Sequence, residues 1–371
     1  MDDRPTVATI HLGAIRANYA EACLRAAGRD VIAVVKADAY GHGAGPVARA
    51  LVDAGCRRLA VATLDEGLEL RGAGVAVPIL VLGGVGDGAH AAARAGLTPV
   101  VHHRGHLECL RKVASPEAPI AVHVEVDTGM RRMGAPPEEA ALLLAAVAAE
   151  PALVLEGVYS HFARADEPDP GPSLEQAALF HAVLAAARAR GASAGIVHCA
   201  NSAALFLGAA LDAALPEANA VRPGLLLYGV SPAPHLAPKL RPAMTLRTRV
   251  AHLRAARPGD AVGYAALYRA PRATRIATLP LGYADGVPVA ASNRGFALIR
   301  GRRHVFAGRV SMDFVGVDVG DALVEIGDEA ILFGAAEQGT LPVEEAAAAA
   351  GTISYELLVR VGTRVRRAYE E

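Results

Sequence analysis

The sequence predicts an α/β protein with an N-terminal (β/α)8 TIM-like barrel and a C-terminal mainly-β domain. Three observations support this fold class. Eight short apolar runs alternate with helical stretches up to about residue 228, polar residues follow several of these runs, and strand-like runs with turns dominate after residue 234. The polar residues matter because functional side chains of such barrels gather at the carboxyl ends of the strands.

The apolar runs expected to form the barrel strands are residues 31–35, 59–62, 78–82, 98–101, 120–126, 153–159, 196–199 and 220–222. Stretches with helical periodicity, such as residues 66–71 and 138–149, separate most of these runs. Eight such units favour a closed barrel, although an open doubly wound sheet is compatible with the pattern alone.

The second domain is predicted from a change in the sequence pattern after about Pro234. Strand-like runs separated by Gly-, Pro- and Asp-containing turns lie at residues 245–253, 275–280, 296–299, 304–310, 314–317 and 329–333, and helical composition returns at 343–350. We therefore expect the barrel at residues 8–234 and the β-rich domain at 235–371, with residues 1–7 joining the latter.

Composition narrows the class of function. A formal net charge of −1 argues against nucleic acid or an anionic membrane as a partner. The longest apolar stretch, residues 140–149, is too short to span a bilayer, and no signal peptide is recognisable. The four cysteines are scattered singly. This pattern is typical of free thiols in a reducing cytoplasm, where we expect the protein to reside.

Lys36 is the first candidate for chemistry, because it closes a buried apolar run and is followed by a Gly-rich turn. An amine carried by a rigid strand to the mouth of a barrel can lose water and become a neutral nucleophile. A surface lysine where a strand emerges is the simpler interpretation of this residue alone. However, Arg132, His161, Ser202 and Arg222 follow other strands, and together they indicate a site for a small ligand that bears an anion.

Several motifs then occur in a fixed order. They are Lys36-Ala-Asp-Ala-Tyr40-Gly-His-Gly43, Asp127-Thr-Gly-Met-Arg-Arg132-Met-Gly134, Tyr159-Ser-His161, Asn201-Ser202, Arg222-Pro-Gly-Leu-Leu-Leu-Tyr228-Gly229, Gly263-Tyr264, Leu281-Gly-Tyr283-Ala-Asp-Gly286, Gly308-Arg-Val-Ser-Met312-Asp313 and Ser354-Tyr355-Glu356. Nearly end to end, this order resembles the alanine racemase family of two-domain enzymes that use pyridoxal 5′-phosphate (PLP).

The resemblance implies that Lys36 binds PLP through a Schiff base. It places Arg222 at the pyridine nitrogen and His161 beside Arg222. Because arginine stays charged, it does not readily hand that nitrogen a full proton, so the ring is a modest electron sink. The cofactor phosphate is expected near Tyr40, Ser202, the amides of Gly224 and Leu225, and Tyr355.

The resemblance also implies a two-base racemisation, with Lys36 on one face of the substrate and Tyr264 of the partner subunit on the other. A homodimer with shared active sites is therefore expected. Tyr283 and Met312 are expected to form a gate and a contact to the substrate carboxylate, with Asp313 in support. Arg132 is the other expected partner of a carboxylate or tyrosinate.

Glu125 departs from the pattern, because many family members carry a lysine there that is often carbamylated. Glutamate supplies a carboxylate without CO₂, so we predict that Glu125 pairs with Arg132 directly or through water. The alternative is an inward-facing barrel residue satisfied by another neighbour. Two other features are expected to be structural: a solvated helix start containing His102, His103 and His106, and a hydrogen-bonded core histidine at position 198.

The resemblance implies interconversion of L- and D-alanine, supplying D-alanine for bacterial peptidoglycan. Three alternatives remain open. A racemase with another or broader amino-acid range would share every motif. A decarboxylase of the same fold is expected to use Glu where this chain has Arg222. A non-enzymatic PLP-binding barrel would lack the second domain that carries Tyr264 and Met312. No metal site is expected, because the histidine-rich stretch has no acidic or cysteine ligand at a fitting spacing.

Overall fold

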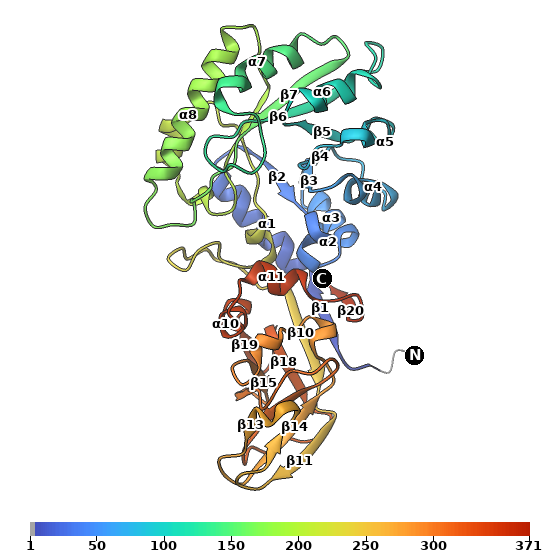
Figure 1. Ribbon diagram of the computed structural model, residues 1–371, viewed down its shortest axis with the longest axis vertical. Helices are drawn as coiled ribbons and strands as arrows, with labels where there is room; N and C mark the ends of the chain where they lie inside the picture. Colours follow the sequence, from blue (N-terminus) through green and yellow to red (C-terminus); the bar gives the residue numbers. More distant parts are fainter. Residues whose placement is uncertain (1–3) are drawn as a thin grey trace.

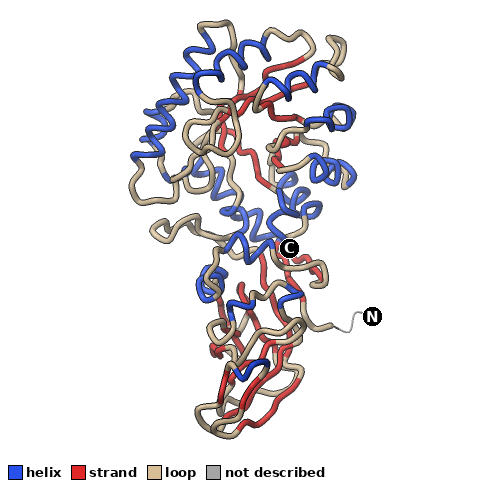
Figure 2. Tube along the Cα trace, in the orientation of Figure 1, coloured by secondary structure: helices blue, strands red, loops and turns tan. Residues whose placement is uncertain are grey.

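The computed structural model describes residues 4–371 as an elongated molecule of two domains (Figure 1). The N-terminal domain is a closed parallel barrel with helices around it, and the C-terminal domain consists mostly of strands (Figure 2). Both halves of the predicted fold class are confirmed.

The barrel strands follow one another around the barrel in sequence order. They are β2 (Asp30–Val34), β3 (Arg58–Val61), β4 (Ile79–Val81), β5 (Thr98–Val101), β6 (Ile120–Glu125), β7 (Leu153–Tyr159), β8 (Ile196–His198) and β9 (Ala220–Val221). Strand β9 pairs with β2 and closes the barrel, so the open-sheet alternative is wrong. Each strand falls on a predicted apolar run, because strands covered by helices are buried on both faces and read as continuous apolar segments.

Helices surround this barrel and connect its strands. They are α1 (Leu12–Ala26), α2 (Lys36–Gly41), α3 (Ala44–Asp53), α4 (Leu64–Gly72), α5 (Ala89–Arg94), α6 (Arg104–Arg111), α7 (Pro137–Ala148), α8 (Gly171–Arg188) and α9 (Ala209–Ala214). Local sequence fixes several of their ends. Helix α4 starts with a capping box between Thr63 and Glu66, and α7 starts at Pro137, whose missing N–H is not needed at a first helical position.

The second domain contains one large sheet and two smaller ones. The large sheet has the order β16 (Arg302–Val305), β15 (Phe296–Ile299), β18 (Glu329–Ala336), β10 (Met244–Arg249), β1 (Val7–His11), β20 (Arg366–Glu370), and β19 (Gly339–Leu341) pairs with β18. The smaller sheets are β11 (His252–Ala256) with β14 (Thr274–Leu279) and β17 (Val315–Asp318), and β12 (Ala261–Val262) with β13 (Tyr268–Arg269). Helices α10 (Val343–Ala349) and α11 (Ser354–Val359) complete the domain.

Strand β1 pairs with strands of the second domain. It lies between β10 and β20 in the large sheet, although the prediction gave residues 8–11 to the barrel. Both partners of β1 are distant in sequence, and no local pattern could reveal them. Of the predicted joining segment 1–7, residues 1–3 lie outside the described residues. The remaining division at residue 234 stays a prediction.

The predicted strand 245–253 is two strands in two different sheets. The amide of Val250 donates to Asp328 O at 2.9 Å, whereas the next amide, that of Ala251, donates to Thr278 O at 2.9 Å. The chain therefore crosses from the large sheet to the small one at this point. Both halves are strand-like in composition, so the break is invisible in the sequence.

Candidate active site

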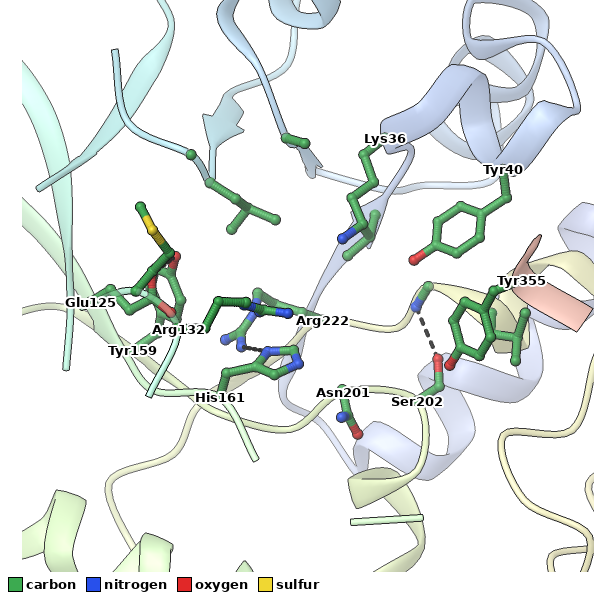
Figure 3. Close-up of a pocket in the computed structure, with 17 residues that line it drawn as sticks. Lys36, Tyr40, Glu125, Arg132, Tyr159, His161, Asn201, Ser202, Arg222 and Tyr355 are labelled. Carbon is green, nitrogen blue, oxygen red and sulfur yellow. Dashed lines mark hydrogen bonds between the residues drawn. The ribbon is translucent and has the colours of Figure 1, made fainter. Parts of the chain in front are cut away.

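A cavity of about 360 Å³ opens at the carboxyl ends of the barrel strands (Figure 3). Its volume is within the range of roughly 300–1,000 Å³ usual for small-molecule sites. Ten residues singled out from the sequence line it: Lys36, Tyr40, Glu125, Arg132, His161, Ser202, Arg222, Gly224, Leu225 and Tyr355. Nine of them come from the barrel, and Tyr355 comes from α11 of the second domain.

Lys36 lies two residues after the end of the apolar strand β2 and extends its amine into the cavity (Figure 3). Burial lowers the pKa of this amine, and the nearby positive charge of Arg132 lowers it further. Both effects favour the neutral amine, which is the form that attacks a carbonyl carbon.

The backbone after Lys36 forms a left-handed turn. Ala37, Asp38, Ala39 and Tyr40 all have φ between 52° and 54°. This conformation costs about 1–2 kcal/mol for each L-residue, so neighbouring contacts must stabilise it. Asp38 Oδ1 accepts from the amide of Ala44 at 2.6 Å, and Glu66 Oε1 accepts from the amide of Ala37 at 2.7 Å. The sequence predicted a turn here, but the handedness of four non-glycine residues carries no local signal.

The second domain packs against this turn. The guanidinium of Arg367 donates to the carbonyls of Gly41, Val361 and Gly362, which joins the end of the turn to the segment after α11. Gly41 has φ +81°, and a Cβ there would lie 2.4 Å from Leu358 O. Glycine is therefore required for the close approach of the two domains. This contact also brings Tyr355 to the cavity, where its ring lies 6.1 Å from that of Tyr40.

Hydrogen-bond donors gather at one end of the cavity. The Oγ of Ser202 accepts from the amides of Gly224 at 2.9 Å and Leu226 at 3.3 Å, at the start of a short 3₁₀ turn. A Cβ on Gly224 would lie 2.4 Å from the hydroxyl of Tyr40, so glycine lets this hydroxyl approach the loop. Backbone amides and hydroxyls in this arrangement form a suitable cradle for a phosphate.

Arg222 is almost fully buried at the floor of the cavity. Its guanidinium donates to His198 Nδ1 at 2.6 Å, to Ser160 O at 2.8 Å and to His161 Nδ1 at 3.2 Å, and it lies 4.5 Å from the ring centre of Tyr159. Burial and the charge of Arg222 lower the pKa of His161 to about 3. His161 is therefore neutral, and because its Nδ1 accepts from Arg222, its hydrogen is on Nε2.

Glu125 does not form the direct ion pair predicted with Arg132 among the described residues. Tyr159 donates to its Oε2 at 3.0 Å, and His102 Nε2 lies 3.0 Å from the same oxygen. The register of β6 and β7 sets Glu125 opposite Tyr159, so the carboxylate is satisfied by its strand neighbour. The prediction of direct pairing is wrong; the arrangement through water stays a prediction.

The predicted solvated helix start is wrong for His102. This residue follows β5 directly and is buried, with its Nε2 also 3.0 Å from Leu82 O. Helix α6 begins two residues later, at Arg104. The prediction that His198 is a hydrogen-bonded core histidine is confirmed, since it is fully buried between His123 and Arg222.

Four predicted site residues lie outside the cavity lining. Tyr264, Tyr283 and Met312 belong to the second domain and are 69%, 45% and 51% exposed. Asp313 accepts from Arg364 at 2.7 Å. Tyr264 lies between β12 and β13 of the second domain. Within one chain these residues and Lys36 form no common site.

Tyr159 is a site residue for which no role was predicted. Its ring packs against the guanidinium of Arg222, and its hydroxyl donates to Glu125. Burial and the carboxylate of Glu125 raise the pKa of this phenol, which keeps it a donor. A signal was present, because Tyr159 ends an apolar strand two residues before His161. Alternation along a strand, however, does not tell which polar residue faces the cavity.

A closed parallel barrel with a partly buried lysine, a phosphate-type cradle and an attached β domain defines a class of two-domain barrel enzymes. The family models for the alanine racemase N-terminal and C-terminal domains match residues 10–232 and 243–369. The chain therefore belongs to the alanine racemase family, and the prediction that it is an enzyme of this isomerase family is confirmed.

Individual relatives cover nearly the whole chain. The alanine racemase of Sorangium cellulosum is 42% identical, over 99% of this chain and 100% of its own. That of Desulforamulus reducens is 43% identical, over 98% and 99%. The crystal structure of alanine racemase from Streptomyces lavendulae superimposes with a TM-score of 0.92 at 40% identity, covering 99% of this chain and 97% of that one.

Proposed function

We propose that the protein interconverts L- and D-alanine with PLP bound covalently to Lys36. The observation that carries this proposal is the amine of Lys36 facing a cavity that has a phosphate-type cradle at one end and the buried Arg222 at its floor. Membership of the alanine racemase family supports alanine as the substrate. The sequence motifs alone left the amino-acid range open.

The residues present fit PLP at its phosphate, its pyridine nitrogen and its aldehyde carbon. The amides of Gly224 and Leu225 and the hydroxyls of Tyr40, Ser202 and Tyr355 would hold the phosphate. Arg222 would face the pyridine nitrogen, and the amine of Lys36 would bond to the aldehyde carbon. Gly224 supports this fit, because a side chain at that position would displace the Tyr40 hydroxyl from the cradle.

Bound PLP supplies an electron sink that acidifies the α-proton of the substrate. Arg222 keeps this sink modest, because it is held as a charged donor by three acceptors and gives up no proton easily. Burial lowers the pKa of the Lys36 amine and so favours its neutral form, which can take a proton from Cα on its own face and later return it.

Inversion needs a second acid–base group on the opposite face of Cα. We assign this role to Tyr264 of a partner subunit in a homodimer. The large exposed fractions of Tyr264 and Met312, both in the second domain, support this assignment, since a second copy could insert them into the cavity. In the same assembly Tyr283 and Met312 would gate the entrance, with Asp313 in support, and Arg132 would bind the substrate carboxylate.

A cytoplasmic role in supplying D-alanine for peptidoglycan is the biological proposal that follows. Among residues 4–371, no helix combines the length and apolar composition needed to cross a bilayer. The balanced charge likewise offers no feature for a nucleic-acid partner.

The function is tested by incubating the purified protein and PLP with L-alanine in D₂O. We expect the optical rotation to fall to zero while deuterium enters Cα, since each inversion exchanges this proton. Release of CO₂ would instead identify a decarboxylase of the same fold. A parallel incubation with L-serine measures the amino-acid range. The absence of deuterium from Cα in every substrate would contradict the proposal.

Gly224→Ala is expected to weaken PLP binding by about tenfold while the fold is retained. In the variant the new methyl group would lie 2.4 Å from the Tyr40 hydroxyl and would displace this hydroxyl from the cradle. Titration of the cofactor-free protein with PLP, followed by its visible absorbance, measures the effect. Gly72→Ala is the control, because a Cβ there meets nothing within 4 Å. Equal affinities in the two variants would contradict the proposed cradle.

A further inference from the structure

A chain of hydrogen bonds crosses the barrel interior from Arg222 to Glu156. Arg222 Nη1 lies 2.6 Å from His198 Nδ1, His198 Nε2 lies 2.8 Å from His123 Nδ1, and His123 Nε2 lies 3.3 Å from Glu156 Oε2. Both histidines are at most 1% exposed. The chain connects the floor of the cavity to a carboxylate that does not line it.

The two ends of this chain determine where its hydrogens lie. Arginine can only donate, so His198 accepts at Nδ1 and, being neutral, carries its hydrogen on Nε2. His123 must then accept at Nδ1 and donate from Nε2, and the carboxylate of Glu156 can only accept. Burial lowers the pKa of both imidazoles, which keeps them neutral. A single arrangement of hydrogens therefore satisfies every contact.

Two backbone features place Glu156 and His123 together. In the pairing of β6 with β7, Val122 lies opposite Leu155 and His123 lies opposite Gly157, so Glu156 is an extra residue in a β-bulge. Bulges redirect a side chain that regular alternation would point elsewhere. A Cβ on Gly157 would lie 2.2 Å from Cε1 of His123, so the glycine leaves the space that this ring occupies.

The buried charge of Arg222 interacts with the nearby carboxylate of Glu125 and, through the hydrogen-bonded chain, with that of Glu156. Its guanidinium is 4% exposed, and among residues 4–371 its hydrogen-bond acceptors are two neutral imidazoles and a carbonyl. An isolated buried charge is costly, and a hydrogen-bonded chain ending in a carboxylate polarises each member toward the cation. Glu156 remains ionised, because the hydrogen bond from His123 and the contact with Arg58 hold its pKa at about 2 despite partial burial.

We infer that Glu156 is a positioning residue for catalysis, which acts through His123 and His198 to fix the orientation and charge of Arg222. The inference rests on the proposed function, because Arg222 is the group assigned to the cofactor ring. It adds a residue at the far end of the barrel interior to the site. Loss of the carboxylate changes the hydrogen positions along the chain and thereby the donor presented to the ring nitrogen.

Glu156→Gln tests this inference. The carboxylate serves two donors, Arg58 at 3.0 Å and His123. In the variant the single amide oxygen faces Arg58, which can only donate, so the NH₂ group faces His123. The hydrogen of His123 then moves to Nδ1, that of His198 moves to Nδ1 as well, and the bond from Arg222 is lost. We expect kcat to fall about tenfold with KM little changed, the size typical for loss of an outer hydrogen-bond partner.

Two measurements decide the outcome. ¹⁵N spectra of histidine-labelled protein, with and without PLP, report which nitrogen of His123 is protonated, and a His123→Asn variant identifies its signals. Alanine turnover reports kcat and KM. Asp30→Asn is the control, because Asp30 contacts Arg58 at 3.6 Å but is not part of the hydrogen-bonded chain from Arg222 to Glu156. Glu156→Asp keeps the charge and is expected to restore most of the rate.

The inference is overturned if His123 keeps its hydrogen on Nε2 in Glu156→Gln, or if kcat equals that of the wild type. It is also overturned if Asp30→Asn loses as much activity, since the loss would then come from Arg58. The spectra need no cofactor and no turnover. If the wild-type protein fails to racemise alanine, the proposed function falls, while the spectra still test the hydrogen-bonded chain.

Discussion

Lys36→Ala is expected to abolish covalent attachment of PLP and to lower alanine racemisation by about a thousandfold or more. The amine is the proposed point of attachment and also one of the two proton carriers, so a single change removes both roles. Its lowered pKa, caused by burial and by Arg132, makes it the amine suited to this task in the cavity. Borohydride reduction followed by peptide mapping should label residue 36 in the wild type and no residue in the variant.

Lys239→Ala is the matched control, because this residue lies outside the cavity lining. It should retain the label at residue 36 and the full rate. A label elsewhere in Lys36→Ala, with racemisation preserved, would disprove the assignment of the cofactor site. Loss of the label without loss of activity would separate PLP from the reaction altogether.

Tyr264→Phe is expected to cut turnover in both directions by roughly 10²–10⁴-fold, the usual contribution of a positioned acid–base group. The visible absorbance of bound PLP should stay the same, because the phenol does not take part in attachment. Tyr268→Phe is the control from the same domain, since its hydroxyl already donates to Asp318. An unchanged rate in Tyr264→Phe would assign the second base to another residue, with Tyr283 as the next candidate.

Mixing the two inactive variants tests whether the site is shared. In a dimer of one Lys36→Ala chain and one Tyr264→Phe chain, one of the two shared sites contains both native residues. After unfolding and reassembly of an equal mixture, we expect about a quarter of the wild-type activity, because half of the dimers are mixed and half of their sites are intact. No recovery would show that Tyr264 does not act across the dimer.

The barrel could be predicted from the sequence because each of its strands is a short apolar run with a turn on either side. Strand β7, for example, coincides with the run 153–159. Prediction failed where pairing depends on residues far apart in the chain. The position of strand β1 is set by its pairing with β10 and β20. The break between β10 and β11 arises because two adjacent amides donate to two different sheets.

The cavity lining was also largely predictable, since its residues follow strands whose carboxyl ends must meet. The supporting residues were not. Glu125 was expected beside Arg132, but the register of two strands set it against Tyr159. Glu156 was missed because a bulge, which has no simple sequence signature, redirects its side chain. The hydrogen-bond partners of Glu125 and Glu156 depend on the register between neighbouring strands, which the identity of a single residue does not determine.

The place of β1 has a consequence for biosynthesis. Residues 7–11 are synthesised before the barrel, yet one neighbouring strand is made only after the whole barrel and the other only when residues 366–370 emerge. At about 10 residues per second, this strand waits tens of seconds with both edges unpaired. Until then the unpaired edges of residues 7–11 can pair with other chains, so we expect this segment to be a binding site for a ribosome-bound chaperone.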